Sequence, residues 1–220
     1  MSPPAENFRS PAALCRFLLV AVVLLALDLL VKSLAFSHLA LAIRTYPGGV
    51  VRVEGRTVEI IPGWVHLDLT ANQGAVFGVG QGQRIIFILV SIGAVAFLCY
   101  LFARSGRQAG YQVILGMLLA GVLGNLYDRI RLGYVRDMIH ALPGWHWPHW
   151  FVSILPDVTW KYGEVFPWIF NVADTLLTCG VSLLVLHGLY IEALARRKSA
   201  PPAPPADLPP GRASTPTNPA

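Results

Sequence analysis

The amino-acid sequence predicts an all-α membrane protein with four transmembrane helices and a small extramembrane β subdomain in the first outer loop. Hydrophobic residues make up 55% of the 220 residues and charged residues only 13%, which is more apolar surface than a soluble chain of this length can bury. Several uncharged runs also reach the roughly 20 residues that a helix needs to cross a bilayer. A helix satisfies its backbone hydrogen bonds internally, so isolated spans of this kind are predicted to be helical.

Four apolar runs define one membrane domain between two polar tails. The domain covers residues 12–191, and the tails cover 1–11 and 192–220. The predicted spans lie at about 12–35, 85–102, 111–129 and 168–191, with outer loops at 36–84 and 130–167. The first run is too long for a cleavable signal peptide, and it carries two charged residues. The second tail is rich in Pro and Ala from Pro201 onward, which predicts a disordered cytoplasmic segment.

Alternating residues in the first outer loop predict short strands. Segments 51–54 and 57–60 alternate on either side of Gly55, which is typical of a hairpin, and segment 65–69 alternates again. We therefore expect a small β subdomain that rests on the membrane surface.

Basic residues predict that both termini are cytoplasmic. They are dense in the short loop, at Arg104 and Arg107, and after the last span, at 196–198. Other arginines lie in the segments assigned to the outer side. The cytoplasmic placement of the termini is therefore predicted from the density of the basic residues in the short loop and after the last span, and not from their total number. The relative placement of the polar groups described next is the same in either orientation.

Polar side chains gather at one membrane face, because consecutive spans run in opposite directions. Ionisable groups at this depth are costly and commonly mark a functional site. Asp28 and Lys32 lie one helical turn apart, which favours a local ion pair. Asp128 beside Arg129 is compatible with either a structural or a functional role. The full set comprises Asp28, Lys32, Asn72, Asn125, Asp128, Arg129, Asp137, Asn171 and Asp174.

Asp137 and Asp174 are the predicted catalytic pair, since neither has an obvious cationic partner in the sequence. Asn171 lies three residues before Asp174, so it can support that carboxylate. Two carboxylates held together at a partly dry interface share one proton. The ionised carboxylate can then take a proton from water while the protonated one polarises a peptide carbonyl.

Other functional classes fit the sequence less well. The net charge is +5, but no basic run is interleaved with aromatic residues, so we expect no nucleic-acid partner. Cys15, Cys99 and Cys179 lie in apolar runs without disulfide or metal-ligand spacing. A transporter would place its polar groups near the bilayer midplane, often with internal repeats. The His-Glu-x-x-His motif of metalloproteases is absent from the sequence.

Four motifs, in order along the chain, resemble those of lipoprotein signal peptidase, also called signal peptidase II. The first is Asp-Leu-Leu-Val-Lys at 28–32, and the second is Asn-Gln-Gly-Ala-Val-Phe-Gly at 72–78. The third is Gly-Asn-Leu-Tyr-Asp-Arg at 124–129 followed by Gly-Tyr-Val-Arg-Asp at 133–137. The fourth is Phe-Asn-Val-Ala-Asp at 170–174. The resemblance covers about residues 14–191.

The resemblance implies an aspartyl endopeptidase of the bacterial cytoplasmic (inner) membrane, with its active site near the outer face. Its substrates would be diacylglyceryl-modified prolipoproteins, cut before the lipidated cysteine, and membrane lipid would be its surroundings. The enzyme would need no metal or organic cofactor, act as a monomer and be inhibited by globomycin. Asp137 and Asp174 would be catalytic. Substrate binding or dyad support would fall to Asn72, Gly74, Asn125, Arg129 and Asn171, and bracing of the fold to Asp28, Lys32 and Asp128.

The segment 140–167 departs from the family pattern, because it is longer and rich in Trp and His. An aromatic belt at the membrane interface is one interpretation, and a flap that covers the substrate is the other. His146 and His149 lack a convincing third metal ligand. Met138 also replaces the Phe that usually follows the first catalytic aspartate. A member of the family that binds lipoprotein precursors without cutting them remains an alternative.

Overall fold

Four long apolar helices and two small antiparallel sheets make up the computed structural model, which describes residues 10–74, 83–106, 108–152 and 163–199. The helices are α2 (Pro11–Leu39), α3 (Arg84–Arg104), α4 (Ala109–Arg131), the short α5 (His149–Val152) and α6 (Val172–Ser199). The strands are β1 (Ala40–Thr45), β2 (Val51–Gly55), β3 (Val58–Ile61), β4 (Val65–Asn72), β5 (Val135–Ala141) and β6 (Ile169–Phe170). Helices α2, α3, α4 and α6 are long and apolar enough to cross a membrane. The four predicted spans are therefore present as four long apolar helices, which is consistent with a multi-pass membrane protein.

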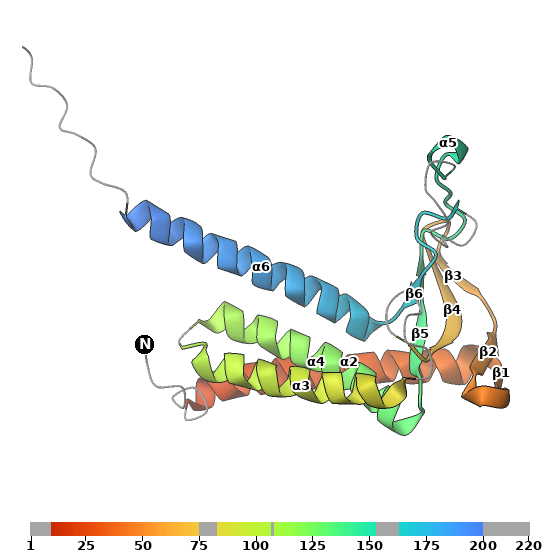
Figure 1. Cartoon of the computed structure of the whole chain (residues 1–220), viewed down its shortest axis with the longest axis horizontal. Helices are drawn as coiled ribbons and strands as arrows, with labels where there is room; N and C mark the ends of the chain where they lie inside the picture. The colour runs from red at the N-terminus through yellow and green to blue at the C-terminus, as the bar shows by residue number, and fades with distance from the viewer. Residues whose placement is uncertain (1–9, 75–82, 107, 153–162, 200–220) are drawn as a thin grey trace, which may run out of the picture. The chain divides into compact units, whose positions relative to one another are not determined.

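Helix α4 is the central helix of the membrane domain, and α2 and α3 pack against it (Figure 1). Its most apolar window is 56% buried, against 17% for α2 and 11% for α3. The other helices therefore expose most of their apolar side chains, such as Leu19 and Ile85, which suits them to contact with lipid. Close approach needs small residues, and Gly116 of α4 lies against the backbone of Phe17 in α2. The Phe17 ring stacks on Phe102 of α3 with centroids 4.3 Å apart.

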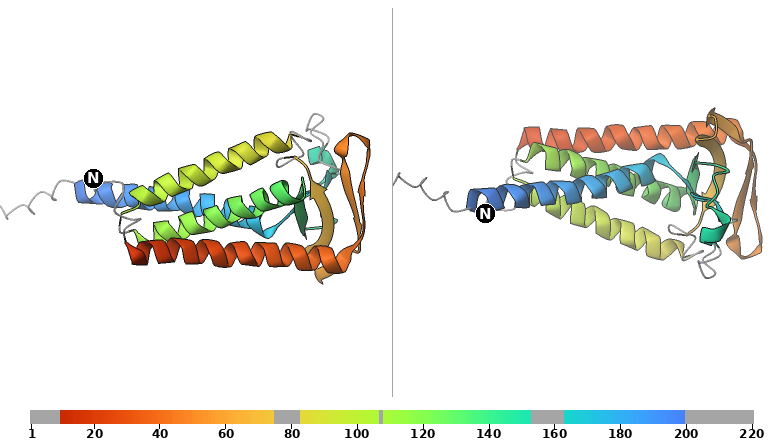
Figure 2. Two further views of the ribbon diagram at one scale, coloured as in Figure 1. Left: turned by 90° about the horizontal axis from the view of Figure 1, so that it is seen from below. Right: turned by 90° about the horizontal axis from the view of Figure 1, so that it is seen from above.

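The two sheets lie across one end of α2, α3 and α4 (Figure 2). Strands β1 and β2 form one sheet, and β3, β4, β5 and β6 form the other in that order. The predicted hairpin between 51–54 and 57–60 is wrong, because β2 pairs with β1 and β3 pairs with β4. The physical reason is the turn at Pro47–Gly49, where Gly48 and Gly49 adopt positive φ angles that bring β1 back onto β2.

The β subdomain is not confined to the first loop as predicted, since β5 and β6 come from the segment after α4. Strand β5 pairs with β4 and β6 pairs with β5. Residues 169 and 170, which were expected inside the fourth span, are therefore strand residues, and α6 begins only at Val172. This arrangement places the start of α6 beside β5.

The C-terminal part of the chain, from Leu186, forms a second unit. Within it, Arg196 pairs with Glu192 one helical turn earlier, at 2.5 Å. The predicted disordered tail from Pro201, most of the first tail, and Arg107 lie outside the described residues.

Gly124 of α4 is predicted to be intolerant of a side chain. A Cβ at this position would meet the Asp28 carboxylate and would lie 3.3 Å from the Cβ of Ala173. We expect Gly124→Ala to lower the free energy of unfolding by about 1–3 kcal/mol, because overpacking forces buried groups apart. The measurement is the thermal midpoint in detergent. Gly93→Ala in α3 is the control, because nothing lies within 4 Å of its added Cβ. Equal midpoints for the two variants would contradict the prediction.

Candidate active site

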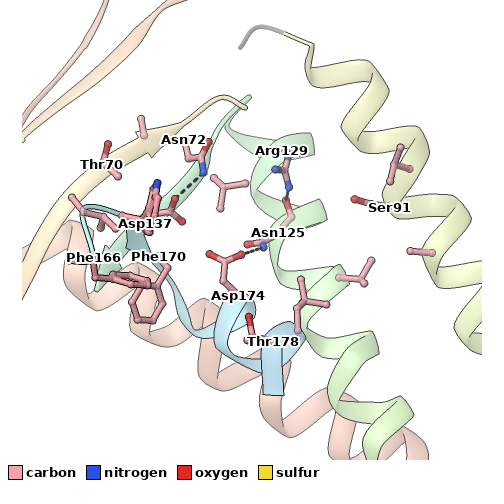
Figure 3. Close-up of a pocket in the computed structure, with 18 residues that line it drawn as sticks. Thr70, Asn72, Ser91, Asn125, Arg129, Asp137, Phe166, Phe170, Asp174 and Thr178 are labelled. Atoms are coloured by element: carbon pink, nitrogen blue, oxygen red, sulfur yellow. Dashed lines mark hydrogen bonds between the residues drawn. The ribbon is translucent and has the colours of Figure 1, made fainter. Parts of the chain in front are cut away.

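Asp137 of β5 and Asp174 of α6 line the same cavity (Figure 3). The cavity has a volume of ≈ 630 Å³ and lies among α3, α4, the first turns of α6 and the strands β4, β5 and β6. The two aspartates are 37 residues apart in sequence. The sheet register and the late start of α6 bring them together.

The position of Asp174 follows from how α6 begins. Asn171 precedes the first helical residue, and its Oδ1 accepts a hydrogen bond from the backbone N–H of Asp174 at 3.0 Å. In return, the Asp174 carboxylate accepts from the backbone N–H of Asn171 at 3.1 Å. This reciprocal pair is a capping box with an aspartate at its third position. Asp28 of α2 adds a further cap by accepting from the Ala173 N–H at 2.8 Å.

The position of Asp137 follows from the pairing of β5 with β4, in which it lies opposite Thr70. Its side chain is buried, and two carboxamides donate to it. Asn171 Nδ2 donates to Oδ1 at 2.5 Å, and Asn72 Nδ2 donates to Oδ2 at 3.0 Å. Asn171 therefore donates to both catalytic carboxylates, to Asp137 through its side chain and to Asp174 through its backbone N–H.

Burial raises the pKa of Asp137 from its ordinary 3.8 to about 7, and the nearby charge of Asp174 adds to the shift. The hydrogen bonds from Asn171 and Asn72 and the charge of Lys32 act in the opposite direction. A carboxyl whose pKa is raised by folding holds its proton more tightly in the folded state. Its contribution to stability is full below about pH 3.8 and is lost as the pH rises through about 7.

The stability of the protein is therefore predicted to depend on Asp137 between pH 5 and 8. We expect the unfolding free energy of the wild type to fall relative to Asp137→Asn by on the order of 2 kcal/mol over this range. Thermal midpoints of both proteins in detergent across the range measure this difference. Glu192→Gln, which removes an exposed carboxylate, is the control and should follow the wild type. Parallel curves for wild type and Asp137→Asn would rule the prediction out.

Asn125 of α4 joins the dyad to the buried charges. Its Nδ2 donates to Asp174 at 2.8 Å, while its Oδ1 accepts from Lys32 Nζ at 3.0 Å and from Asn171 at 3.2 Å. Lys32 also lies 2.8 Å from Asp28, so the expected pair is present.

Asp128 pairs with Arg136 at 2.7 Å and lies 3.5 Å from Lys32. Arg129, its neighbour in sequence, makes other contacts. The backbone N–H of Arg136 also donates to the Asp128 carboxylate at 3.0 Å. Arg136 was not among the predicted site residues. Its position directly before Asp137 in the sequence is the signal that could have placed it near the site.

Arg129 connects three segments around the cavity. Its guanidinium donates to the carbonyl of Gly74 at 3.0 Å and to the carbonyl of Asn125 at 3.5 Å, and it lies over the Phe87 ring of α3. Of the two residues predicted from the first part of the motif at 72–78, Asn72 lines the cavity and donates to Asp137, and Gly74 contacts Arg129 and Asn72. The rest of that motif, residues 75–78, lies outside the described residues.

Apolar side chains form much of the remaining cavity wall. Helices α3, α4 and α6 contribute Val90, Ala94, Val122 and Leu177, and the segment before α6 contributes Phe166, Trp168, Ile169 and Phe170. None of these residues was predicted from the sequence to line a cavity, although the aromatic content of the long segment is evident there.

The Trp-rich segment divides into two parts. Phe166 near the end of the segment and Trp168 just after it line the cavity. Trp145 and Trp150 do not line the cavity, and both are exposed. Trp145 packs on Trp64 with ring centroids 5.1 Å apart and donates to the Gly63 carbonyl at 2.8 Å. Trp160 lies outside the described residues.

Within the described ranges, no group of three or more His, Cys, Asp or Glu side chains is arranged to hold a metal ion. The cavity offers two carboxylates, two carboxamides and a guanidinium, and a third carboxamide, that of Asn171, donates to Asp137. This is a set suited to proton transfer and to binding of a peptide backbone.

Comparison with known proteins agrees with the motifs. A family model described as signal peptidase (SPase) II matches residues 20–190. A lipoprotein signal peptidase of Anaeromyxobacter sp. (strain Fw109-5) is 37% identical over 132 residues, which are 57% of this chain and 54% of that relative. One from Streptococcus pyogenes serotype M5 (strain Manfredo) is 33% identical over 171 residues, 77% of this chain and 90% of the relative. The fold is similar to a bacterial membrane enzyme solved by the in meso method at 2.3 Å resolution, with a TM-score of 0.58, 26% identity, and coverage of 87% of this chain and 94% of that one.

Proposed function

Because the chain belongs to the signal peptidase II family, we propose that it is an aspartyl endopeptidase that removes the signal peptide from diacylglyceryl-modified bacterial prolipoproteins. The observation that carries the proposal is the pair Asp137 and Asp174, which line one cavity and are linked by Asn171. The lipoprotein signal peptidases to which the chain is similar carry the substrate class in their names.

The two aspartates are suited to different roles. Asp137 is buried among apolar walls and has a pKa of about 7, so it holds the proton that the pair shares. Asp174 lies in the first turn of α6, where a negative charge is favoured, and it accepts two N–H donors. In the proposed reaction, Asp174 takes a proton from water as the water oxygen attacks the scissile carbonyl. Asp137 donates its proton to the carbonyl oxygen.

The second step returns both protons. The carbon–nitrogen bond breaks, and Asp174 gives its proton to the leaving amine. The new carboxylic acid forms as the protonated oxygen returns its proton to Asp137. Asp137 is then protonated and Asp174 ionised, as at the start. Water is the only reactant consumed besides the peptide.

A lipid-modified substrate fits the position of the site. The dyad lies where the helices meet the sheet, and the cavity wall includes apolar residues of α3 and α6, such as Val90 and Leu177. Acyl chains kept in the bilayer would hold the scissile bond at this level, and positioning of this kind contributes several kcal/mol to catalysis. We place the site at the outer face of the cytoplasmic membrane and the termini on the inner side.

Cleavage of a purified diacylglyceryl-prolipoprotein by the purified protein in detergent tests the proposal. We expect a signal peptide released just before the lipidated cysteine, identified by mass spectrometry, with undiminished activity in EDTA. A folded wild-type protein that binds the precursor without cutting it would support the binding-only alternative instead.

A further inference from the structure

Lys32 is a buried cation for which the proposed reaction has no direct use. Its side chain is fully buried in α2, and its Nζ lies within 2.8 Å of Asp28 and 3.5 Å of Asp128. The family resemblance implies a bracing role for Lys32, and its contacts with the two carboxylates are sufficient for that role. Its third contact, a 3.0 Å hydrogen bond to Asn125 Oδ1, points toward the dyad and needs another explanation.

Three carboxamides surround the dyad, and all three are oriented in the same way. Each has a nitrogen donor facing its oxygen, so that its Nδ2 is directed at a catalytic carboxylate. The Asn72 oxygen accepts from the Gly74 N–H at 3.0 Å. The Asn171 oxygen accepts from the Asp174 N–H at 3.0 Å. For Asn125, the corresponding donor is the ammonium of Lys32.

Orientation matters because a carboxamide presents a donor on one side and an acceptor on the other, in nearly the same shape. A flipped Asn125 would aim an oxygen lone pair at the ionised Asp174 and would lose the 2.8 Å donor contact. An ammonium has no acceptor, so a flipped Asn125 would also set its NH₂ against Lys32. The other partner of the Asn125 oxygen is Asn171 Nδ2 at 3.2 Å, which is shared with Asp137 at 2.5 Å.

Among the buried charged side chains that the structure describes, Lys32 is the one that donates to the Asn125 carboxamide oxygen. Asp28 also accepts from the Ala173 N–H, and Asp128 also pairs with Arg136. Both carboxylates therefore have partners of their own besides the ammonium. Arg129 contacts the carbonyls of Gly74 and Asn125, and no hydrogen bond between it and the Asn125 carboxamide oxygen is found among the described residues.

We propose that Lys32 is a positioning residue of the active site, whose ammonium fixes the Asn125 carboxamide so that it donates to Asp174. The proposal rests on the proposed function, because it assigns a role in the same dyad. Lys32 acts through Asn125 and has no hydrogen bond of its own to either catalytic carboxylate among the described contacts.

The charge of Lys32 also gives the proposal a measurable signature. Lys32 lowers the pKa of Asp137, so its removal raises that pKa. The alkaline limb of the pH–rate profile, where the dyad loses its shared proton, then moves to higher pH. An uncharged residue that only braces the fold would lower the thermal midpoint and the active fraction without moving this limb. The limb therefore reports the charge of Lys32, and the comparison with Asn125→Ala reports whether Lys32 acts by positioning Asn125.

The test compares Lys32→Met with Asp28→Asn in the prolipoprotein cleavage assay over pH 5 to 9. For Lys32→Met we expect a roughly 10- to 100-fold lower kcat and an alkaline limb at higher pH. Asp28→Asn breaks the same ion pair but keeps the donor to Asn125, so its thermal midpoint falls and its alkaline limb stays at the wild-type pH. If Lys32→Met alone does not fold, the double variant Asp28→Asn with Lys32→Met replaces it, because removing both partners leaves no unpaired buried charge from that ion pair. The double variant should show the same alkaline limb at higher pH.

A double-mutant comparison asks whether Lys32 acts through Asn125. In an Asn125→Ala background, Lys32→Met should lower kcat less than twofold further, because the carboxamide it orients is already absent. Independent multiplication of the two losses, or a wild-type alkaline limb in Lys32→Met, would overturn the proposal. Infrared titration of the carboxyl band that Asp137→Asn removes reports the same shift without turnover. The inference can thus fail or hold even if the cleavage assay rejects the proposed function.

Discussion

Asp174→Asn is expected to lower prolipoprotein cleavage by at least about 10³-fold while the protein still folds. An amide cannot take a proton from water, so the attacking hydroxide would not form. The fold should tolerate the change, because an amide oxygen can still accept from the Asn171 N–H that now bonds to Asp174. Asp137→Asn should have an effect of similar size, since the group that protonates the carbonyl oxygen is lost.

The measurement is the single-turnover rate of signal-peptide release, with the thermal midpoint in detergent as the test of folding. Asp68→Asn is a matched control, because Asp68 is a carboxylate of the same sheet that pairs with His140 and does not line the cavity. It should keep activity within about threefold. Full activity in Asp174→Asn would remove that residue from the catalytic role.

The fold was predictable where a single local signal decides it. Uninterrupted apolar runs are sufficient to locate the four long helices, because each must satisfy its own backbone in lipid. Strand β1 was missed because Ala40–Thr45 follows α2 directly, with no Gly or Pro between them to mark where the helix ends and the strand begins. Its pairing with β2 depends on two glycines in the turn between them, and alternation within 51–54 cannot reveal which neighbour it pairs with.

The polar residues of the site were predictable because each is costly at that depth and has few structural alternatives. The apolar residues that line the cavity were not predictable. Phe166 and Trp168 are residue types typical of a membrane interface, and they reach the cavity only because β6 pairs with β5. Long-range register also decides that Asp128 pairs with Arg136 across the turn after α4. From the sequence alone, Asp128 beside Arg129 was compatible with either a structural or a functional role.

Asn171 is expected to be the most sensitive residue of the site after the two aspartates. It starts α6, donates to Asp137 at 2.5 Å and donates to Asn125 at 3.2 Å. Asn171→Ala should therefore have two separable effects. Loss of the helix cap should lower the free energy of unfolding by about 1 kcal/mol. Loss of the donor to Asp137 should lower kcat by about 10²-fold, because a hydrogen bond to a charged or proton-sharing carboxyl contributes more than one between neutral groups.

Asn171→Ser separates these effects, because a serine hydroxyl caps a helix about as well as asparagine but cannot supply the Nδ2 donor. We expect the serine variant to regain most of the thermal midpoint and little of the lost kcat. Its alkaline limb should lie above that of the wild type, since a hydrogen bond that lowers the pKa of Asp137 is gone. If serine restored both stability and activity, Asn171 would act only as the cap of α6, and the orientation of Asp174 alone would account for its effect on catalysis.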